Sequence, residues 1–192
     1  MNTTNETISR PGIDDRSVWV GCLACYNNGD LVGRWLWPEE GPDWVCPNSA
    51  REEADGFGPH EETWVMDHQC FGGWLQGECS PSEALRIAGL LEQIEDDGED
   101  PDLVRAWADQ AGVDVDDWTA ASYAYDESKA GVYQSWVDFA EQNVAELGWN
   151  GVMPDVIEQL GSAIDYDYIA RELRHDYWGL DFDGALHVFR SN

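Results

Sequence analysis

Two sets of residues alternate over positions 18–25: one is Val18, Val20, Cys22 and Ala24, and the other is Trp19, Gly21, Leu23 and Cys25. We interpret this period of two as a β-strand. Asn28-Gly29 follows, and Asn-Gly is a strong hairpin-turn signal because both residues accept positive φ. We therefore expect a hairpin over residues 17–37. The stretch 38–62 is rich in Pro, Gly and acids and is expected to be irregular, and a third strand is expected over 63–68.

A helical period begins at residue 80. Ser80-Pro81-Ser82-Glu83 combines an N-cap serine, a proline in the first turn and a glutamate at the third helical position, which predicts a capping box. Apolar residues then recur on one helical face up to Ile94, and Gly98 is expected to end this helix. A second helix is expected from Asp100 to Gly112 and a third from Asp114, so the middle of the chain is predicted to be helical.

The last third mixes helices and strands. Ser135 is a capping residue for a further helix, and short helices are expected near 155–160 and 165–173. A closing hairpin is expected over 177–189 around Asp183-Gly184, another dipeptide that suits a two-residue turn.

Aromatic residues are abundant, with 11 Trp, 7 Tyr and 5 Phe, and this composition is typical of a folded chain. No apolar run approaches the roughly 18 residues of a membrane span, and no secretory signal is evident. The chain has five cysteines, which is an odd number. Together these features predict free thiols in a reducing cytoplasm.

The charge is extreme. The chain has 39 Asp and Glu against 10 Lys and Arg, a formal net charge of -29, and Lys129 is its single lysine. Such a polyanion repels nucleic acid and anionic membrane surfaces, so neither is an expected partner. The expected partner is a basic surface.

Acidic residues are densest between positions 92 and 117, where Arg105 is the one basic residue. The eleven acids of this segment are Glu92, Glu95, Asp96, Asp97, Glu99, Asp100, Asp102, Asp109, Asp114, Asp116 and Asp117. Asp100 and Asp114 suit helix N-caps. Glu95, Asp96 and Asp97 instead fall at a helix C-terminus, where the helix dipole disfavours each by ~0.3–1 kcal/mol. Charge placed against local stability indicates that the charge itself serves a function.

Two interpretations of the charge are open. B-DNA carries one phosphate charge per ~1.7 Å of axis, so the 39 Asp and Glu side chains of the whole chain, at that density, would match roughly 65 Å of duplex. The alternative is an acidic, salt-adapted protein-binding module, whose surface carboxylates serve solubility in salt.

Several short motifs occur in a characteristic order over about residues 17–190. They are Leu23-Ala24-Cys25-Tyr26-Asn27-Asn28-Gly29 with Gly33-Arg34-Trp35, the segments 64–71, 121–133 and 135–141, and the pair 164–173 with His187-Val188-Phe189. With this charge, they resemble the ArdA-type antirestriction family. His68 and Cys70 depart from the family's usual residues in the second segment.

The resemblance implies an α+β protein built as an elongated chain of three small domains. These are a small antiparallel sheet with a helix (17–79), an acidic helical middle domain (80–120) and a mixed C-terminal domain (121–192). The polar residues 1–16, with Pro11-Gly12 near their end, are expected to form a flexible N-terminal extension before the first domain. The family forms homodimers through the last domain.

The resemblance also implies the function. Family members are acidic DNA mimics that occupy the DNA-binding channel of type I restriction–modification enzymes, and they block both restriction and modification. They act in the cytoplasm, are commonly encoded on mobile genetic elements, and use no catalytic residue and no cofactor. The eleven acids named above are the expected DNA-mimic carboxylates.

The segment 121–133 lies where the family carries its antirestriction motif, at or near the dimer interface. Its candidate residues are Ala121, Tyr123, Tyr125, Asp126, Glu127, Ala130, Gly131 and Tyr133. The alternative is an ordinary helix–strand junction in which Tyr123, Tyr125 and Tyr133 are buried.

A zinc site and an enzyme are two rival interpretations of the sequence. Cys22-x-x-Cys25 has zinc-ligand spacing, and Cys46, His60, His68, Cys70 and Cys79 are further candidate ligands. Within a continuous strand, however, Cys22 and Cys25 would point to opposite faces, so no metal is predicted. The four histidines, His60, His68, His175 and His187, are scattered, and no nucleophile elbow or phosphate loop occurs, so no enzyme is predicted.

Overall fold

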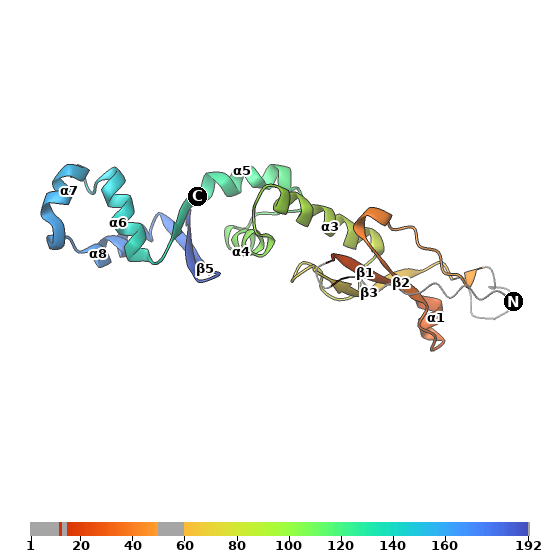
Figure 1. Cartoon of the computed structure of the whole chain (residues 1–192). Coiled ribbons are helices and arrows are strands. Elements are labelled where there is room, and N and C mark those ends of the chain that lie inside the picture. The colour runs from red at the N-terminus through yellow and green to blue at the C-terminus, as the bar shows by residue number, and fades with distance from the viewer. Residues whose placement is uncertain (1–11, 13–14, 50–59, 192) are drawn as a thin grey trace. The chain divides into compact units, whose positions relative to one another are not determined.

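The computed structural model describes residues 12, 15–49 and 60–191. Helices and small antiparallel sheets are mixed along the chain, which confirms the α+β class (Figure 1). The chain divides into two compact units, Met1–Asp102 and Leu103–Asn192. The predicted three-domain arrangement remains a prediction, and most of the predicted N-terminal extension lies outside the described residues.

The first unit contains a three-stranded antiparallel sheet in the order β2-β1-β3. Its strands are β1 (Ser17–Cys22), β2 (Gly33–Leu36) and β3 (Thr63–Gln69), so the strand expected at 63–68 is confirmed. The 3-10 helix η1 (Pro38–Glu40) follows β2.

The predicted hairpin is correct in its pairing but wrong in its connection. Strand β1 ends at Cys22, and the next residues form the helix α1 (Leu23–Asn27). Asn28-Gly29 therefore ends this helix and does not form a two-residue turn. The three apolar residues after Cys22 fit a strand and a single helical turn equally well, so the local sequence could not decide between the two.

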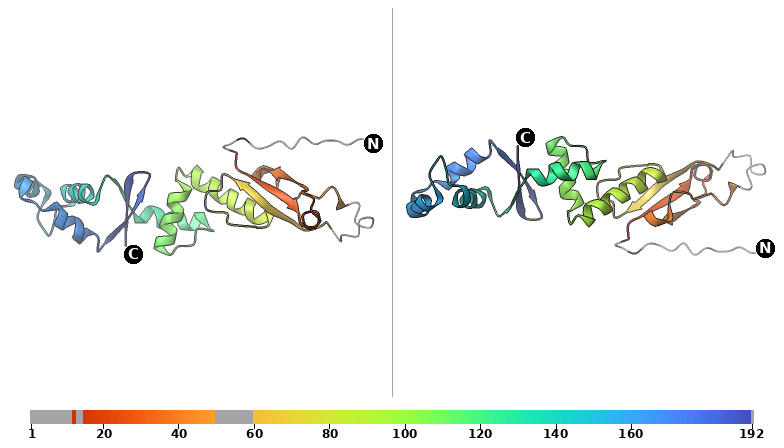
Figure 2. Two further views of the ribbon diagram at one scale, coloured as in Figure 1. Left: turned by 90° about the horizontal axis from the view of Figure 1, so that it is seen from below. Right: turned by 90° about the horizontal axis from the view of Figure 1, so that it is seen from above.

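Helix α3 (Pro81–Asp96) covers one face of this sheet, as Figure 2 shows. Val18, Val20 and Val65 from the strands pack with Ala84 and Leu91 from the helix. The predicted capping box forms only in part. Ser80 Oγ accepts a hydrogen bond from the Glu83 backbone N–H, but the Glu83 carboxylate accepts from the Arg86 guanidinium.

The second unit begins with two helices, α4 (Pro101–Ala111), whose first residues precede the division, and α5 (Trp118–Ser128). The third predicted helix starts later than expected. Asp117, and not Asp114, caps it by accepting from the Ala120 N–H, while Asp114 accepts from the Asp116 N–H. Both acids suit an N-cap, and burial of Trp118 in the first turn selects the later start.

A second three-stranded sheet follows, in the order β4-β6-β5. Its strands are β4 (Lys129–Tyr133), β5 (Tyr177–Phe182) and β6 (Ala185–Arg190). The helices inserted between β4 and β5 are α6 (Trp136–Leu147), α7 (Pro154–Leu160), the 3-10 helix η3 (Gly161–Ala163) and α8 (Tyr166–Leu173). The Ser135 cap and the Asp183-Gly184 turn, with φ of 47° and 76°, are both confirmed.

Among the described residues, none of the helices has the length and apolar character needed to cross a membrane.

Candidate functional site

The acidic segment (residues 92–117) presents its carboxylates to solvent. Ten of the eleven acids are exposed, and Glu99 is half-buried. Those from Glu92 to Asp102 belong to the first unit, on the end of α3 and the start of α4, and those from Asp109 to Asp117 belong to the second. The structure therefore gathers the predicted carboxylates into two groups, one on each unit.

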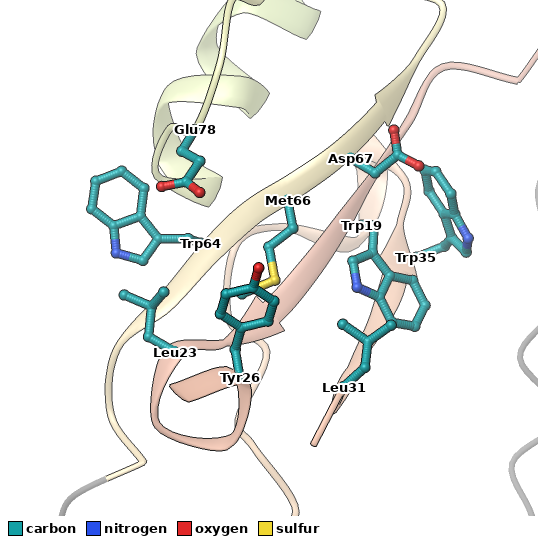
Figure 3. A pocket seen from close by; sticks show the side chains of 9 residues that line it. All are labelled: Trp19, Leu23, Tyr26, Leu31, Trp35, Trp64, Met66, Asp67 and Glu78. Atoms are coloured by element: carbon teal, nitrogen blue, oxygen red, sulfur yellow. The ribbon is translucent and has the colours of Figure 1, made fainter. Parts of the chain in front are cut away.

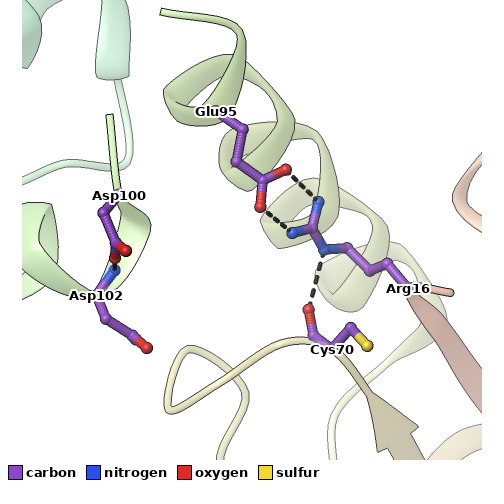
Figure 4. Close-up of polar contacts among 5 residues, drawn as sticks. All are labelled: Arg16, Cys70, Glu95, Asp100 and Asp102. Atoms are coloured by element: carbon purple, nitrogen blue, oxygen red, sulfur yellow. Dashed lines mark hydrogen bonds and ion pairs between the residues drawn. The ribbon is translucent and has the colours of Figure 1, made fainter. Parts of the chain in front are cut away.

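Glu95 has a structural partner that the sequence did not reveal. Arg16 donates two hydrogen bonds to its carboxylate, at 2.6 and 3.2 Å, and a third from Nε to the Cys70 carbonyl at 3.1 Å (Figure 4). Such bidentate pairs are stronger than ordinary hydrogen bonds. Glu95 lies near the C-terminus of α3 as predicted, but its charge is offset by a partner that is 79 residues away in sequence.

Other acids of the segment also have local uses. Asp100 accepts from the Asp102 N–H at 2.9 Å at the start of α4, as the sequence predicts for an N-cap (Figure 4). In contrast, Glu92, Asp96 and Asp109 are exposed and make no side-chain hydrogen bond or ion pair within the described parts of the chain. Within the described residues, no hydrogen bond or ion pair of these three carboxylates stabilises the fold.

The antirestriction segment (residues 121–133) runs from α5 into β4 and is partly core. The Tyr125 ring is fully buried, with ring centroids 5.0 Å from Trp107 and 5.8 Å from Trp118. Ala121 is also buried. The Tyr123 side chain, however, is 74% exposed, so the junction interpretation that buries all three tyrosines is wrong for Tyr123.

The β4 end of the segment is shaped by a bulge. The register of β4 against β6 shifts between Lys129 and Gly131, and Gly131 has a φ of 143°, a conformation that only glycine adopts readily. Ala130 lies inside this bulge, and Tyr133 Oη donates to its carbonyl at 3.0 Å. Burial raises the pKa of the Tyr133 phenol, and the carboxylates of nearby acids add to this shift.

Strand β4 lies at an edge of its sheet, with β6 as its neighbour among the described strands. Val132 on β4 is 60% exposed, and Tyr123 lies on the preceding helix. Asp126 and Glu127 are exposed, and Asp126 pairs with Lys129 at 3.3 Å. An open edge with exposed apolar side chains is a surface on which another chain can pair.

A pocket of about 510 Å³ lies on the face of the first sheet opposite α3 (Figure 3). Its lining residues are Trp19, Leu23, Tyr26, Leu31, Trp35, Trp64, Met66, Asp67 and Glu78. Trp19 and Trp35 meet edge to face, with centroids 6.0 Å apart. Aromatic rings with two carboxylates suit a cationic side chain, and these lining residues include no nucleophile paired with a base.

Four buried side chains that can bind a metal ion meet at the end of the same sheet where β1 finishes. They are Cys22 at the end of β1, Cys25 in α1, Cys46 in the loop after η1 and His60 before β3. The prediction that Cys22 and Cys25 point to opposite faces is wrong, because α1 turns the chain after Cys22. The Cys22-x-x-Cys25 spacing is the sequence signal for this cluster. Only the fold shows that Cys46 and His60, among the other candidate ligands, are the two that lie beside this pair.

The thiols of the cluster have unequal acidities. Burial raises the pKa of Cys46 to about 12, and the neighbouring Cys22 and Cys25 add to this increase. Burial also opposes ionisation of Cys22, but hydrogen bonds from the Cys25 backbone N–H and from His60 outweigh it and lower the Cys22 pKa. Cys22 therefore loses its proton more readily than Cys46.

The fold and the acidic segment define a class: a folded, strongly acidic α+β protein whose candidate site is a surface of carboxylates. A model of the antirestriction protein (ArdA) family matches residues 18–185, so the chain belongs to the ArdA antirestriction family. A search of curated proteins found no match. Members of the ArdA family are antirestriction proteins, inhibitors that act against restriction enzymes and are not themselves enzymes.

Proposed function

We propose that this protein inhibits type I restriction–modification enzymes as a DNA mimic. Its exposed carboxylates would occupy the basic channel in which such an enzyme holds DNA, and thereby block both cleavage and methylation. The observation that carries the proposal is the acidic segment: eleven acids, ten of them exposed, in a chain with a net charge of -29. The proposal places the protein in the cytoplasm, where the enzyme acts on DNA. It places the gene on a mobile genetic element, which inhibition of restriction would protect.

The physical basis is electrostatic. Phosphate neutralisation by Lys and Arg supplies much of the affinity of a protein for DNA and makes that affinity fall with salt. A folded protein that holds carboxylates in place can take the same contacts without a large ordering cost on binding. Because it presents no base edges, it should inhibit enzymes with different recognition sequences equally well.

The test is inhibition of two type I enzymes that recognise different sequences. We expect the purified protein to block methylation and cleavage by both, and to lose potency by on the order of 10³-fold or more between 50 and 200 mM salt. Unmodified phage should also plate with higher efficiency on a restricting host that expresses the protein. Inhibition of neither enzyme at low salt would overturn the proposal.

A salt-adapted protein-binding module is the second candidate, which the acidic composition favours. It predicts that the chain unfolds at low salt and recovers its structure at molar salt, because cations must screen the self-repulsion. Cooperative thermal unfolding in 0.1 M salt, together with inhibition, excludes this candidate.

We further propose that the protein is a homodimer that pairs through the antirestriction segment. Exposed Val132 on the edge strand β4 and exposed Tyr123 on α5 support this surface. Val132→Glu is expected to convert a dimer of about twice the 21.6 kDa chain mass into a monomer, because it places a charge in an apolar contact.

Light scattering after gel filtration measures this change. Val156→Glu is the matched control, because Val156 is 47% exposed on α7 in the same unit and outside the segment. The interface proposal fails when the Val132 variant keeps the mass of the wild-type protein, or when the Val156 variant loses it equally.

A further inference from the structure

The cysteine–histidine cluster (Cys22, Cys25, Cys46 and His60) has ligand atoms from three separate stretches of backbone. Cys22 ends a strand, Cys25 lies in the short helix that follows, and Cys46 and His60 come from the connection between η1 and β3. Their side chains are between 0% and 4% exposed. All four ligand atoms lie within 4.8 Å of one another.

The distances fit one particular geometry. His60 Nδ1 lies 3.4 Å from Cys22 Sγ, 3.3 Å from Cys25 Sγ and 3.8 Å from Cys46 Sγ. The Cys25 and Cys46 sulfurs are 3.7 Å apart. A tetrahedral zinc ion with Zn–S of ~2.3 Å and Zn–N of ~2.05 Å separates sulfur from nitrogen by ~3.6 Å and sulfur from sulfur by ~3.8 Å. These four of the six distances between ligand atoms are thus close to those of a zinc-sized tetrahedron, and the other two are no longer than 4.8 Å.

We propose that Cys22, Cys25, Cys46 and His60 bind one structural zinc ion through three thiolates and the His60 Nδ1. Three cysteines and one histidine are a common structural zinc set, and four protein ligands leave no open position for catalysis. Soft thiolate ligands favour zinc over magnesium or calcium. The role is to fix the end of the sheet and the connection that leads from β2 to β3.

Surrounding N–H groups complete the arrangement. The Cys25 backbone N–H donates to the Cys22 sulfur, and the Asn48 backbone N–H donates to the Cys46 sulfur. The Asn48 side-chain amide donates to Cys25 Sγ at 3.4 Å. Such contacts orient metal ligands and hold negative charge on thiolates. A purely apolar packing of three cysteines has no need for N–H donors directed at each sulfur.

A disulfide is the competing use of these thiols. All five cysteines are free in the structure, and the Cys25 and Cys46 sulfurs are farther apart than the ~2.05 Å of a covalent bond. A disulfide within the cluster would use two of its three cysteines and leave the third beside His60 without a chemical role. Zinc binding uses all four side chains.

The zinc site is independent of the antirestriction proposal and is tested on the full-length chain. Elemental analysis of protein purified without chelator is expected to give about one zinc ion per chain. Cys46→Ser and His60→Ala are expected to lower this to below about a tenth, whereas His60→Cys restores a four-thiolate set and keeps the metal. Cys70→Ser, which removes an exposed thiol outside the cluster, is the matched control and should keep one zinc.

Cobalt provides a second measurement that does not depend on how a variant folds. The wild-type protein, depleted of zinc and loaded with Co²⁺ alone, should show the visible absorption of a tetrahedral thiolate site, which added zinc removes. Folded wild-type protein that holds no zinc and gives no such spectrum overturns the proposal. An intact mass two hydrogens below that of the reduced chain, with no metal, also overturns it in favour of a disulfide.

Discussion

Neutralising Glu92, Asp96 and Asp109 together, as Glu92→Gln, Asp96→Asn and Asp109→Asn, is expected to weaken inhibition of a type I enzyme on the order of 100-fold at 0.15 M salt. The three side chains are exposed and make no hydrogen bond or ion pair within the described residues, so the substitutions should leave the fold unchanged. When log affinity is plotted against log salt concentration, each lost phosphate-like contact makes the slope shallower by about 0.9. The slope for the triple variant should therefore be shallower by about 2 to 3.

The measurement is the inhibition constant in a methylation assay at several salt concentrations. A control with the same loss of charge, Asp30→Asn, Glu158→Gln and Asp181→Asn, removes three exposed acids outside the acidic segment. We expect this control to stay within about threefold of the wild-type protein. Equal losses for the two triple variants would mean that only net charge matters, and the assignment of the acidic segment as the mimic surface would be withdrawn.

Gly33→Ala is expected to destabilise the first unit by about 3 kcal/mol, the upper range for an overpacked site. Gly33 lies in β2 opposite Gly21 of β1, and a methyl group there would meet the Val20 carbonyl oxygen, the Gly21 Cα at 2.9 Å and the Trp19 ring at 3.0 Å. Backbone atoms in a paired strand cannot move aside as a flexible side chain can. The strand pair must therefore separate, which explains why glycine stands at the first position of Gly33-Arg34-Trp35.

The same substitution elsewhere in this unit should act in the opposite direction. Gly89 lies inside α3, and a methyl group at its position meets no atom within 4 Å. Gly89→Ala should raise stability by about 0.5–1 kcal/mol, because alanine favours the helix. Thermal unfolding followed by circular dichroism should show a midpoint lowered by about 10–20 °C for Gly33→Ala and raised by a few degrees for Gly89→Ala. A Gly33→Ala midpoint equal to that of the wild-type protein would refute the steric argument.

Elements defined by neighbouring residues were predicted well from the sequence. Ser80 and Ser135 cap helices as expected, and Asp183-Gly184 forms the predicted turn between β5 and β6. In each case the signal and the structure lie within about four residues of each other, so no distant contact could override the local preference.

Elements that depend on choices between equal local signals were predicted less well. Asp114 and Asp117 are both good capping residues, and burial of Trp118 decided in favour of Asp117. In the antirestriction segment, the spacing of the tyrosines did not show that Tyr125 is core and Tyr123 is surface. The helix α5 fixes that difference by its packing against Trp107.

The sequence by itself determined the charge, the α+β class, the family and most of the helices and strands, because composition and short-range periodicity are properties of the chain alone. The tertiary structure alone decided which distant groups meet. It pairs Arg16 with Glu95, and it turns the chain after Cys22 so that Cys25, Cys46 and His60 converge. Contacts between residues far apart in sequence depend on how the elements pack, and no local pattern encodes them.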